Sequence, residues 1–206
     1  MPAFEPLSPA ALPRRLAAAI DRRSASRLLI GFDGDETVGT GELADRVADE
    51  LVALHRPVVR ISTKWWWRAA SLRLEFGRQD VESRLVGWVD VGSLRREALD
   101  PLAPGGSGRY LTRLRDPERD RSVRDEYQQA SEHAVVLIDG PLLQTHELAL
   151  DLVVRVGVSP NRLSRVLPVD RQWELAAFAE YYRRWPQSEI VVSYDHPDAP
   201  ALRGLG

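Results

Sequence analysis

Five short apolar runs alternate with longer stretches of helical periodicity, and this alternation limits the fold more than any other feature of the chain. The runs are RLLIGF (27–32), PVVRIS (57–62), AVVLID (134–139), LVVRVGV (152–158) and EIVVSY (189–194). Continuous runs rich in Val and Ile are typical of strands buried on both faces of a parallel sheet. We therefore predict an α/β fold with a parallel five-stranded sheet and helices on both faces.

Helical patterns and an irregular stretch fill the rest of the chain, which we predict to be one domain over residues 1–206. An amphipathic helix is expected within residues 1–26, and residues 41–54 place four apolar side chains on one helical face: Leu43, Val47, Leu51 and Leu54. The helical stretch 162–185 is broken by Pro168. Residues 65–130 are rich in Arg, Asp, Gly and Pro, which predicts an excursion over the carboxyl edge of the sheet, on the substrate side.

Composition excludes several classes of function. The formal net charge of −2 gives no electrostatic argument for binding nucleic acid or an anionic membrane. The chain has no cysteine, which rules out disulfides and thiolate metal sites and fits a cytoplasmic protein. The apolar run LAAAI near the N-terminus is too short for a secretory core or a membrane span. The four histidines show no metal-ligand spacing.

Residues 28–45, LLIGFDGDETVGTGELAD, join the first predicted strand to a helix and carry the strongest local signal. Gly34 and Gly39 have the spacing of the phosphate loop G-x-x-x-x-G-K-[ST], whose backbone amides hold phosphate. The lysine and hydroxyl positions of that motif are Thr40 and Gly41. The turn therefore has the backbone features of a phosphate loop without its groups for handling charge.

Two other interpretations of this turn stay open. Asp33, Asp35 and Thr37 form D-x-D-x-T after a strand, which resembles the first motif of the haloacid dehalogenase-like phosphatases. In that family the first aspartate is the nucleophile, the second is the general acid/base, and magnesium lies between carboxylates. Alternatively, glycines and aspartates at a strand-to-helix junction are ordinary turn and capping residues.

The segments together resemble actinobacterial uridine kinase-like proteins of the P-loop nucleoside/nucleotide kinase superfamily. The resemblance runs from LPRRLAAAI, IGFDG, LADRVADEL and RPVVRIS through DPLAPGGSGRY, VVLIDGPLL and THEL to YYRRWPQSEIVVSYDHPDAPAL. It implies a three-layer P-loop NTPase-like fold, ATP and Mg²⁺ as cofactors, a nucleoside or nucleotide ligand, and a lid-like helical region at 159–186. The nucleotide-binding positions it implies are Asp33, Gly34, Gly39, Thr40 and Gly41.

The chain departs from this family at several charged positions. An acidic pair is expected after the second strand, where Lys64 and Trp65 stand instead. Arg165 matches the first of two arginines that the lid helix commonly carries, and Val169 occupies the second position. Asp139 is retained at a strand end, where it could meet magnesium or water. The departures affect phosphate neutralisation, metal coordination and proton removal.

These departures lead to three functional hypotheses. Because phosphoryl transfer depends on positioning and electrostatics, the first is a catalytically impaired member, retained for nucleotide or nucleoside binding, regulation or assembly. The second is an active ATP-dependent nucleoside or small-molecule kinase, with Asp139 and Arg165 retained and Lys64, the only lysine, reaching a phosphate from the opposite wall. The third is a magnesium-dependent phosphatase that uses Asp33 and Asp35.

The run Trp65-Trp66-Trp67 suggests either stacking on a nucleobase or a protein contact. Three consecutive residues cannot all face one ligand, so at least one is expected in the core or in a contact with a homodimer partner or another protein. Trp65, Trp66, Arg109 and Tyr110 are the candidate substrate contacts.

Overall fold

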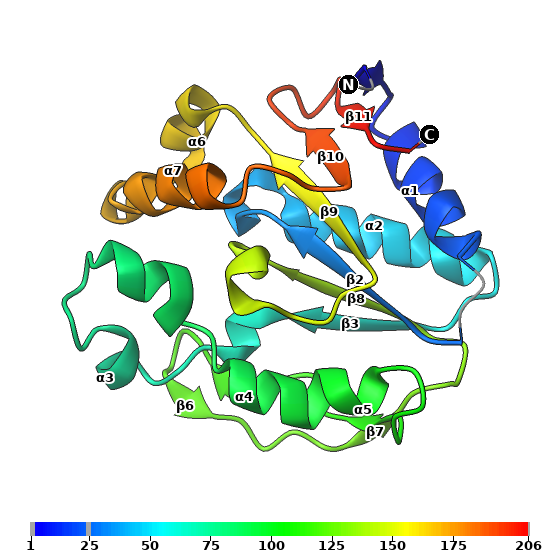
Figure 1. Cartoon of the computed structure of the whole chain (residues 1–206), viewed down its shortest axis with the longest axis horizontal. Helices are drawn as coiled ribbons and strands as arrows, with labels where there is room; N and C mark the ends of the chain where they lie inside the picture. The colour runs from blue at the N-terminus through cyan, green and yellow to red at the C-terminus, as the bar shows by residue number, and fades with distance from the viewer. Residues whose placement is uncertain (1–2, 24–25, 206) are drawn as a thin grey trace.

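A central sheet organises the computed structural model, which describes residues 3–23 and 26–205. The predicted apolar runs form its five parallel strands: β2 (Leu28–Asp33), β3 (Val58–Ser62), β8 (Val135–Gly140), β9 (Leu152–Gly157) and β10 (Ile190–Ser193). They lie side by side in the order β10-β9-β2-β8-β3, and each neighbouring pair is parallel (Figure 1). The predicted α/β fold with a parallel five-stranded core is confirmed.

Two short antiparallel strands extend this sheet beyond β10. They are β11 (Ala201–Arg203) and β1 (Glu5–Pro6), so the complete sheet has seven strands. The prediction of five parallel strands did not include these two antiparallel strands. Strands of two or three residues are too short to show alternation, so the sequence carries no periodic signal for them.

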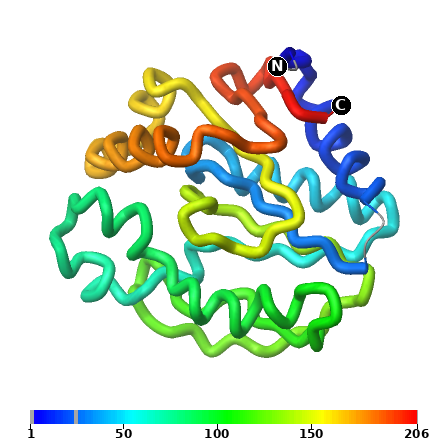
Figure 2. The backbone as a smooth tube through the Cα atoms, in the orientation of Figure 1, coloured from blue at the N-terminus to red at the C-terminus, as the bar shows by residue number. Residues whose placement is uncertain are grey.

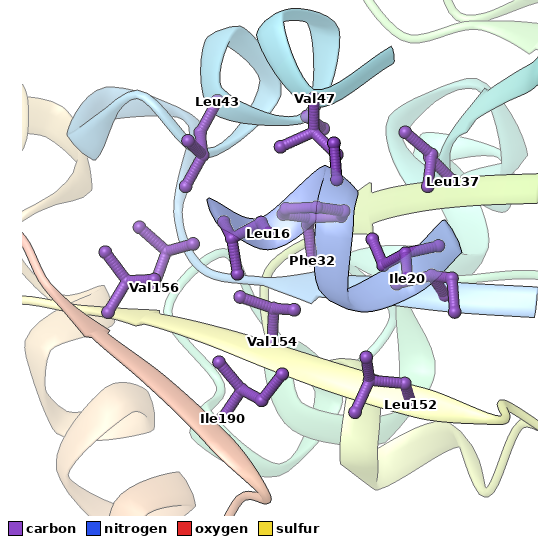
Figure 3. Close-up of a cluster of buried hydrophobic side chains, with 14 of the residues drawn as sticks. Leu16, Ile20, Phe32, Leu43, Val47, Leu137, Leu152, Val154, Val156 and Ile190 are labelled. Carbon is purple, nitrogen blue, oxygen red and sulfur yellow. The ribbon is translucent and has the colours of Figure 1, made fainter. Parts of the chain in front are cut away.

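Two helices cover one face of the sheet. They are α1 (Ala11–Asp21) and α2 (Thr40–Ala53), and their apolar side chains pack on the buried strands (Figure 3). Leu16 of α1 and Leu43 of α2, for example, lie in one cluster with Phe32 of β2. Leu54 was predicted on this face but is 47% exposed, because the helix ends before it at Ala53. The predicted N-terminal segment 1–26 includes residues 1, 2, 24 and 25, which lie outside the described residues. Residue 206 also lies outside them.

The segment 63–130 covers the other face. Its helical elements are η2 (Thr63–Trp66), α3 (Ala70–Arg73), η3 (Ser83–Gly87), α4 (Val91–Leu94), η4 (Arg95–Leu99) and α5 (Asp100–Leu102). Its short strands pair as β4 (Arg109–Tyr110) with β7 (Gln128–Gln129) and β5 (Arg115–Asp116) with β6 (Arg121–Ser122). Elements α4, η4 and α5 pack on β3 and β8, so part of the predicted excursion forms the third layer of the fold.

A separate helical unit lies beside the carboxyl ends of the strands (Figure 2). It consists of α6 (Pro160–Val166), the short turn η6 (Val169–Arg171) and α7 (Glu174–Arg184). The helical stretch is interrupted at Pro168, as predicted, because proline lacks the amide that would continue the helix. No helix in the described part of the chain is long and apolar enough to cross a membrane.

Candidate functional site

A cleft of about 480 Å³ opens at the carboxyl edge of the sheet. Its lining comes from the turn 34–41, the first turns of α2 and the ends of β3 and β8. Residues that follow these two strands, namely Thr63, Lys64 and Pro141, also line it, and the side chains of Trp67, Arg84 and Arg171 complete it. Among the described lining residues, five carboxylates (Asp35, Glu36, Glu42, Asp45 and Asp139) face three cations (Lys64, Arg84 and Arg171). The cleft thus has an excess of negative charge.

The turn 34–41 satisfies three of its amides with its own oxygens. Asp35 accepts hydrogen bonds from the Thr37 amide (2.9 Å) and the Thr37 hydroxyl (2.6 Å). The short helix η1 (Glu36–Val38) follows, and within this turn the amides of Val38 and Gly39 donate to Asp35 O and Glu36 O. Gly39 has φ of 85°, a left-handed conformation that glycine adopts without strain. Three amides that could face a phosphate are therefore already engaged.

Thr40 and Gly41 begin helix α2 without presenting charge to the cleft. The Thr40 hydroxyl donates to Asp35 O at 2.9 Å, and the residue is only 1% exposed. At Gly41, an added Cβ would lie 3.8 Å from Asp139 Oδ2, so a small side chain would fit beside that carboxylate. Leu43 N is the first amide of α2 with a described acceptor, Gly39 O, which leaves the amides of residues 40–42 without an acceptor among the described residues.

Asp139, at the end of β8, is held from two sides. Arg60 Nη2 donates to its Oδ1 at 2.8 Å, and Ser62 Oγ donates to its Oδ2 at 2.9 Å. Arg60 is itself fixed by Nε donating to Asp45 Oδ1 and Nη1 donating to Leu137 O, both at 2.8 Å. Arg60 and Ser62 can reach Asp139 because β3 pairs with β8 in parallel register, with Ser62 opposite Asp139.

Arg171 of η6 connects the helical unit to the turn. Its Nη2 lies 2.5 Å from Asp35 Oδ2, its Nη1 lies 3.3 Å from Glu36 Oε1, and its Nε donates to Glu174 Oε1 at 2.7 Å. Burial alone would lower the pKa of Arg171, but the hydrogen bonds to Glu174 and the attraction of Asp35 outweigh it and raise this pKa. Glu174 also accepts from Arg84 Nε at 2.8 Å, in a pair that is almost fully buried. An ion-pair network thus links the helical unit to the turn.

No family model matches the sequence, and no curated protein matches it either. The comparison of the fold therefore comes from solved structures. The chain superposes on a possible uridine kinase from Bacillus stearothermophilus with a TM-score of 0.69, at 19% identity, over 88% of this chain and 98% of that one. The chain has a uridine kinase-like P-loop fold.

Two further structures share this P-loop kinase fold. A candidate fructose transport system kinase from Silicibacter sp. TM1040 matches with a TM-score of 0.59, at 17% identity, over 88% of this chain and 96% of that one. The YGR205w protein matches with a TM-score of 0.55, at 9% identity, over 95% and 96% of the two chains. The turn 34–41 joins β2 to α2, where a phosphate loop was predicted, and the helical unit 160–184 lies within the segment 159–186 predicted as a lid.

Magnesium, which the fold family implies, would find only part of its expected ligand set at this site. Gly41 stands where the predicted phosphate-loop motif has a hydroxyl ligand, and both oxygens of Asp139 are engaged by Arg60 and Ser62. No group of three or more metal-ligating side chains occurs in the described part of the chain. Other carboxylates of the lining, water and ligand phosphates would have to complete the coordination of a divalent cation here.

Asp33 lies outside the cleft, although it was predicted as a nucleotide contact and as a phosphatase nucleophile. It is 2% exposed, and it accepts hydrogen bonds from Tyr181 Oη (2.5 Å) and the Leu143 amide (3.2 Å), with Arg155 Nε at 3.4 Å. Burial raises its pKa, and the three contacts only partly offset that rise. A carboxylate enclosed in this way has no approach for a phosphate ester, so the geometry gives the phosphatase hypothesis no nucleophile.

The other predicted phosphate-loop and lid residues divide between the cleft and the surface. Gly34, Thr40, Gly41, Lys64 and Asp139 line the cleft. Gly39 shapes the loop through its backbone. Arg165 is exposed on α6 and outside the lining. The second lid position was expected at Val169, in one helix with Arg165. The helix is interrupted at Pro168, and Arg171 of η6 contacts the turn instead.

The tryptophan run separates into one core residue and two residues near the cleft. Trp66 is fully buried in the apolar cluster between β3 and α4, so its prediction as a substrate contact is wrong. Trp65 lines two smaller pockets of about 260 Å³ each, which also involve Arg60 and Lys64 respectively. Trp67 lines the main cleft and packs edge-on against Trp88, with ring centroids 5.1 Å apart.

Arg109 and Tyr110 form β4 and line none of the three pockets near the turn, so neither is placed to contact a ligand there. Tyr110 is 6% exposed, and its hydroxyl donates to Gln128 on the paired strand. Arg109 stacks over Tyr127, with its guanidinium carbon 3.9 Å from the ring centroid. Both predictions were wrong because the β4–β7 pair packs along the third layer of the fold.

Sequence reasoning missed Arg60, Arg84 and Arg171. Arg60 had a readable signal, since an arginine inside the otherwise apolar run PVVRIS must find a partner or solvent. Arg171 follows the helix-breaking Pro168, which could have indicated a change of direction. Arg84 lies in an irregular segment without a periodic signal.

Proposed function

We propose that the protein is a catalytically impaired P-loop kinase homologue, which binds a nucleoside or nucleotide in the cleft and acts through binding rather than phosphoryl transfer. The observation that carries this proposal is the state of the phosphate loop. The position of the motif's lysine is Thr40, whose hydroxyl donates to Asp35 O. The carboxylate of Asp35 accepts a hydrogen bond from the amide of Thr37. A single lost preorganised donor typically lowers the rate by about 10²–10³.

Charge in the cleft supports the same proposal. Carboxylates outnumber cations in the lining, and Asp35 and Glu36 belong to the loop itself. Repulsion between these groups and a polyphosphate opposes tight binding of ATP. The part of the cleft lined by Lys64 and Trp67 carries a different charge, because these residues offer a cation and an aromatic surface to a ligand. A nucleoside or a monophosphate is the ligand that this side favours.

Calorimetric titration tests the proposal. We expect a nucleoside or nucleoside monophosphate to bind the purified protein more tightly than ATP. Restoring the motif with Thr40→Lys and Gly41→Ser together should raise ATP affinity at least tenfold, about 1.4 kcal/mol. The serine is sterically compatible, because an added Cβ meets Asp139 Oδ2 only at 3.8 Å.

The matched control for added charge is Val52→Lys. Val52 lies on the same helix, is 58% exposed and is outside the cleft lining, so its replacement should leave ATP affinity unchanged. The proposal would be contradicted if the wild-type protein bound ATP more tightly than every nucleoside and monophosphate, and if restoring the motif did not raise ATP affinity. The present loop would then be competent to bind ATP. Failure of the whole ligand panel to bind would also reject the proposal.

Lys64 favours a second candidate, an active ATP-dependent nucleoside or small-molecule kinase. It lines the cleft with the phosphate loop, where its ammonium could supply the missing cation. Under this candidate, Lys64→Ala would abolish ATP turnover and weaken ATP binding, while Lys64→Arg would retain part of both. Under impaired catalysis, neither variant changes a turnover that is already at background.

Location and assembly remain predictions. The lack of cysteine favours a cytoplasmic protein, and the exposed parts of the tryptophan run leave a homodimer or another protein partner as a hypothesis. Size-exclusion chromatography with light scattering tests whether the protein forms a homodimer.

A further inference from the structure

Two tryptophans form part of the wall of a cavity of about 260 Å³ beside the main cleft. Trp65 and Trp67 line it together with four charged residues, namely Glu36, Lys64, Asp116 and Glu118. We propose that this cavity binds an organic cation, an alkylated ammonium group such as that of choline. None of these six residues lies in a segment that resembles the kinase family, so the resemblance does not account for the cavity. The inference goes beyond the proposed function, and its test needs no nucleotide.

The two rings are held in place by the structure around them. Trp66, which lies between them in the sequence, is fully buried, and Trp65 O accepts a hydrogen bond from the amide of Leu114 at 3.0 Å. Trp67 packs edge-on against Trp88. Trp65 and Trp67 themselves are half-buried. The aromatic part of the wall is therefore in place before a ligand binds.

The turn that joins β5 to β6 supplies Asp116 and Glu118, and it is fixed as well. Asp116 Oδ1 accepts hydrogen bonds from the amides of Glu118 at 2.9 Å and Arg119 at 3.0 Å. Both carboxylate oxygens of Asp120, in the same turn, lie 3.0 Å from the amide of Ala70, which ties the turn to α3. The hydrogen bond from the Arg119 amide lowers the pKa of Asp116, so this carboxylate is charged at neutral pH.

The charge of the lining favours a cation. Glu36, Asp116 and Glu118 contribute three carboxylates, and Lys64 is the only cationic side chain among the described lining residues. The cavity therefore opposes an anion. The ammonium of Lys64 also opposes a cationic ligand in part, so its removal should strengthen the binding of a cation and weaken that of an anion.

Contacts outside the cavity show that both rings accept cations. The guanidinium carbon of Arg113 lies 5.7 Å from the ring centroid of Trp65, and that of Arg73 lies 4.9 Å from the ring centroid of Trp67. Both distances are within the range of about 6 Å over which the face of a tryptophan attracts a cation. Neither arginine lines the cavity, so neither occupies the space offered to a ligand.

An alkylated ammonium group suits this lining better than a primary one. Asp116 Oδ1 already accepts from two amides, and Glu36 Oε1 lies 3.3 Å from Nη1 of Arg171. A primary ammonium has three N–H donors that need acceptors. A fully alkylated ammonium needs none, because the ring faces and the surrounding negative charge attract it directly.

Calorimetric titration of choline tests the proposal, with neohexyl alcohol as the neutral isostere and ethanolamine as the primary-ammonium counterpart. We expect choline to bind at least about tenfold more tightly than either. Neohexyl alcohol has the shape of choline without its charge, so equal affinities would show that the cavity does not select a cation and would overturn the proposal. Undetectable binding of choline, or tighter binding of ethanolamine, would also overturn it.

Variants of the lining locate the site. Trp65→Leu should weaken choline binding about fivefold, and Glu36→Gln combined with Glu118→Gln should weaken it by a similar factor. Lys64→Gln should instead strengthen it about twofold. Circular dichroism checks that each variant is folded, and the two glutamates are exposed, so the fold does not depend on them.

The matched controls are Trp185→Leu and Glu132→Gln. Both residues lie outside the lining of this cavity and of the main cleft, so their replacement should leave choline affinity unchanged. Unchanged affinity in the folded tryptophan variant or in the double glutamate variant would contradict the proposal. Weaker choline binding after the replacement of Lys64 would contradict it as well, because the ammonium would then attract the ligand.

Discussion

Asp33 and Asp139 lie at the carboxyl ends of neighbouring parallel strands, yet they belong to different parts of the molecule. Phe32, rather than Asp33, lies opposite Asp139 in the register of β2 and β8, and Asp33 lies opposite Gly140. Because side chains alternate between the faces of a sheet, this offset of one residue sends the two carboxylates to opposite faces. Asp139 points toward α2 and the cleft, whereas Asp33 is enclosed under α7.

Each aspartate has an arginine partner, and the environments of the two pairs differ. Arg155 beside Asp33 is 6% exposed as a side chain, while Arg60 beside Asp139 is 25% exposed. A buried pair depends on its partners because an uncompensated charge there is strongly destabilising. A pair that borders a cleft can exchange partners with solvent or ligand. The comparison teaches that strand register decides which of these two carboxylates faces the cleft.

The largest expected effect comes from breaking the buried pair. Arg155→Met should lower the free energy of unfolding by about 3 kcal/mol at pH 7, because it leaves the Asp33 carboxylate without its cation. Urea denaturation measures this loss. Arg183→Met is the matched control, since Arg183 is 70% exposed and pairs with Glu180, and its loss should be under about 1 kcal/mol.

The loss in Arg155→Met should also depend on pH in a defined direction. Burial already raises the pKa of Asp33 in the folded protein, and removing Arg155 should raise it further. A folded pKa above the unfolded value contributes stability at low pH, and this contribution is lost as the pH rises through the folded pKa. The destabilisation should therefore be smaller in acid than at pH 7. Equal losses at both pH values would contradict the assignment of Asp33 as the group left unpaired.

His146 provides the next largest effect, on the side of the molecule that holds Asp33. It ends η5 (Leu143–His146), the turn whose first amide binds Asp33, and burial together with the charge of Arg84 lowers its pKa to about 4. The unfolded state takes up the proton first as the pH falls below 6.5. Stability should therefore fall by roughly 3 kcal/mol between pH 6.5 and 4.

Comparison with His146→Gln isolates this contribution. Glutamine removes the titrating group, so the variant should show a shallower decline of unfolding free energy over the same pH range. Unfolding curves in urea at several pH values give the measurement. Parallel declines in the two proteins would show that His146 does not carry the acid sensitivity of this side.

The smallest effect is expected at the cleft. Asp139→Asn should change the free energy of unfolding by about 1 kcal/mol or less, because the amide still accepts from Arg60 or Ser62 and Arg60 keeps its bond to Asp45. The same urea titration measures it. A loss as large as that of Arg155→Met would mean that Asp139 is a structural residue, and the distinction between the two faces would fail.

The sequence was sufficient for the parallel core of the fold and for the place of the turn. Continuous apolar runs are physically tied to buried strands, which is why β2 and β8 could be predicted from Val, Leu and Ile alone. The edge strands β1 and β11 have no such signal, since their pairing depends on each other and on β10. The stretch 63–130 was harder still, because it has short helices and turns whose packing is set by the faces they cover.

At the candidate site, residues fixed by the local chain were predictable and residues fixed by register were not. Gly34, Thr40 and Gly41 line the cleft because their place follows directly from the strand–turn–helix unit. Asp33 was misplaced because one residue of strand register decides its face. Arg171 was missed because the chain changes direction after Pro168, which a continuous helical register cannot represent.

The most direct test of the account is ATP turnover by the purified wild-type protein with Mg²⁺ and a panel of nucleosides, measured as ADP and as phosphorylated acceptor. A phosphate loop whose threonine and aspartate bond to its own backbone should yield no ADP above the protein-free blank. Sustained ADP formation, matched by phosphorylated nucleoside and lost in Asp139→Asn, would contradict the account and establish an active kinase.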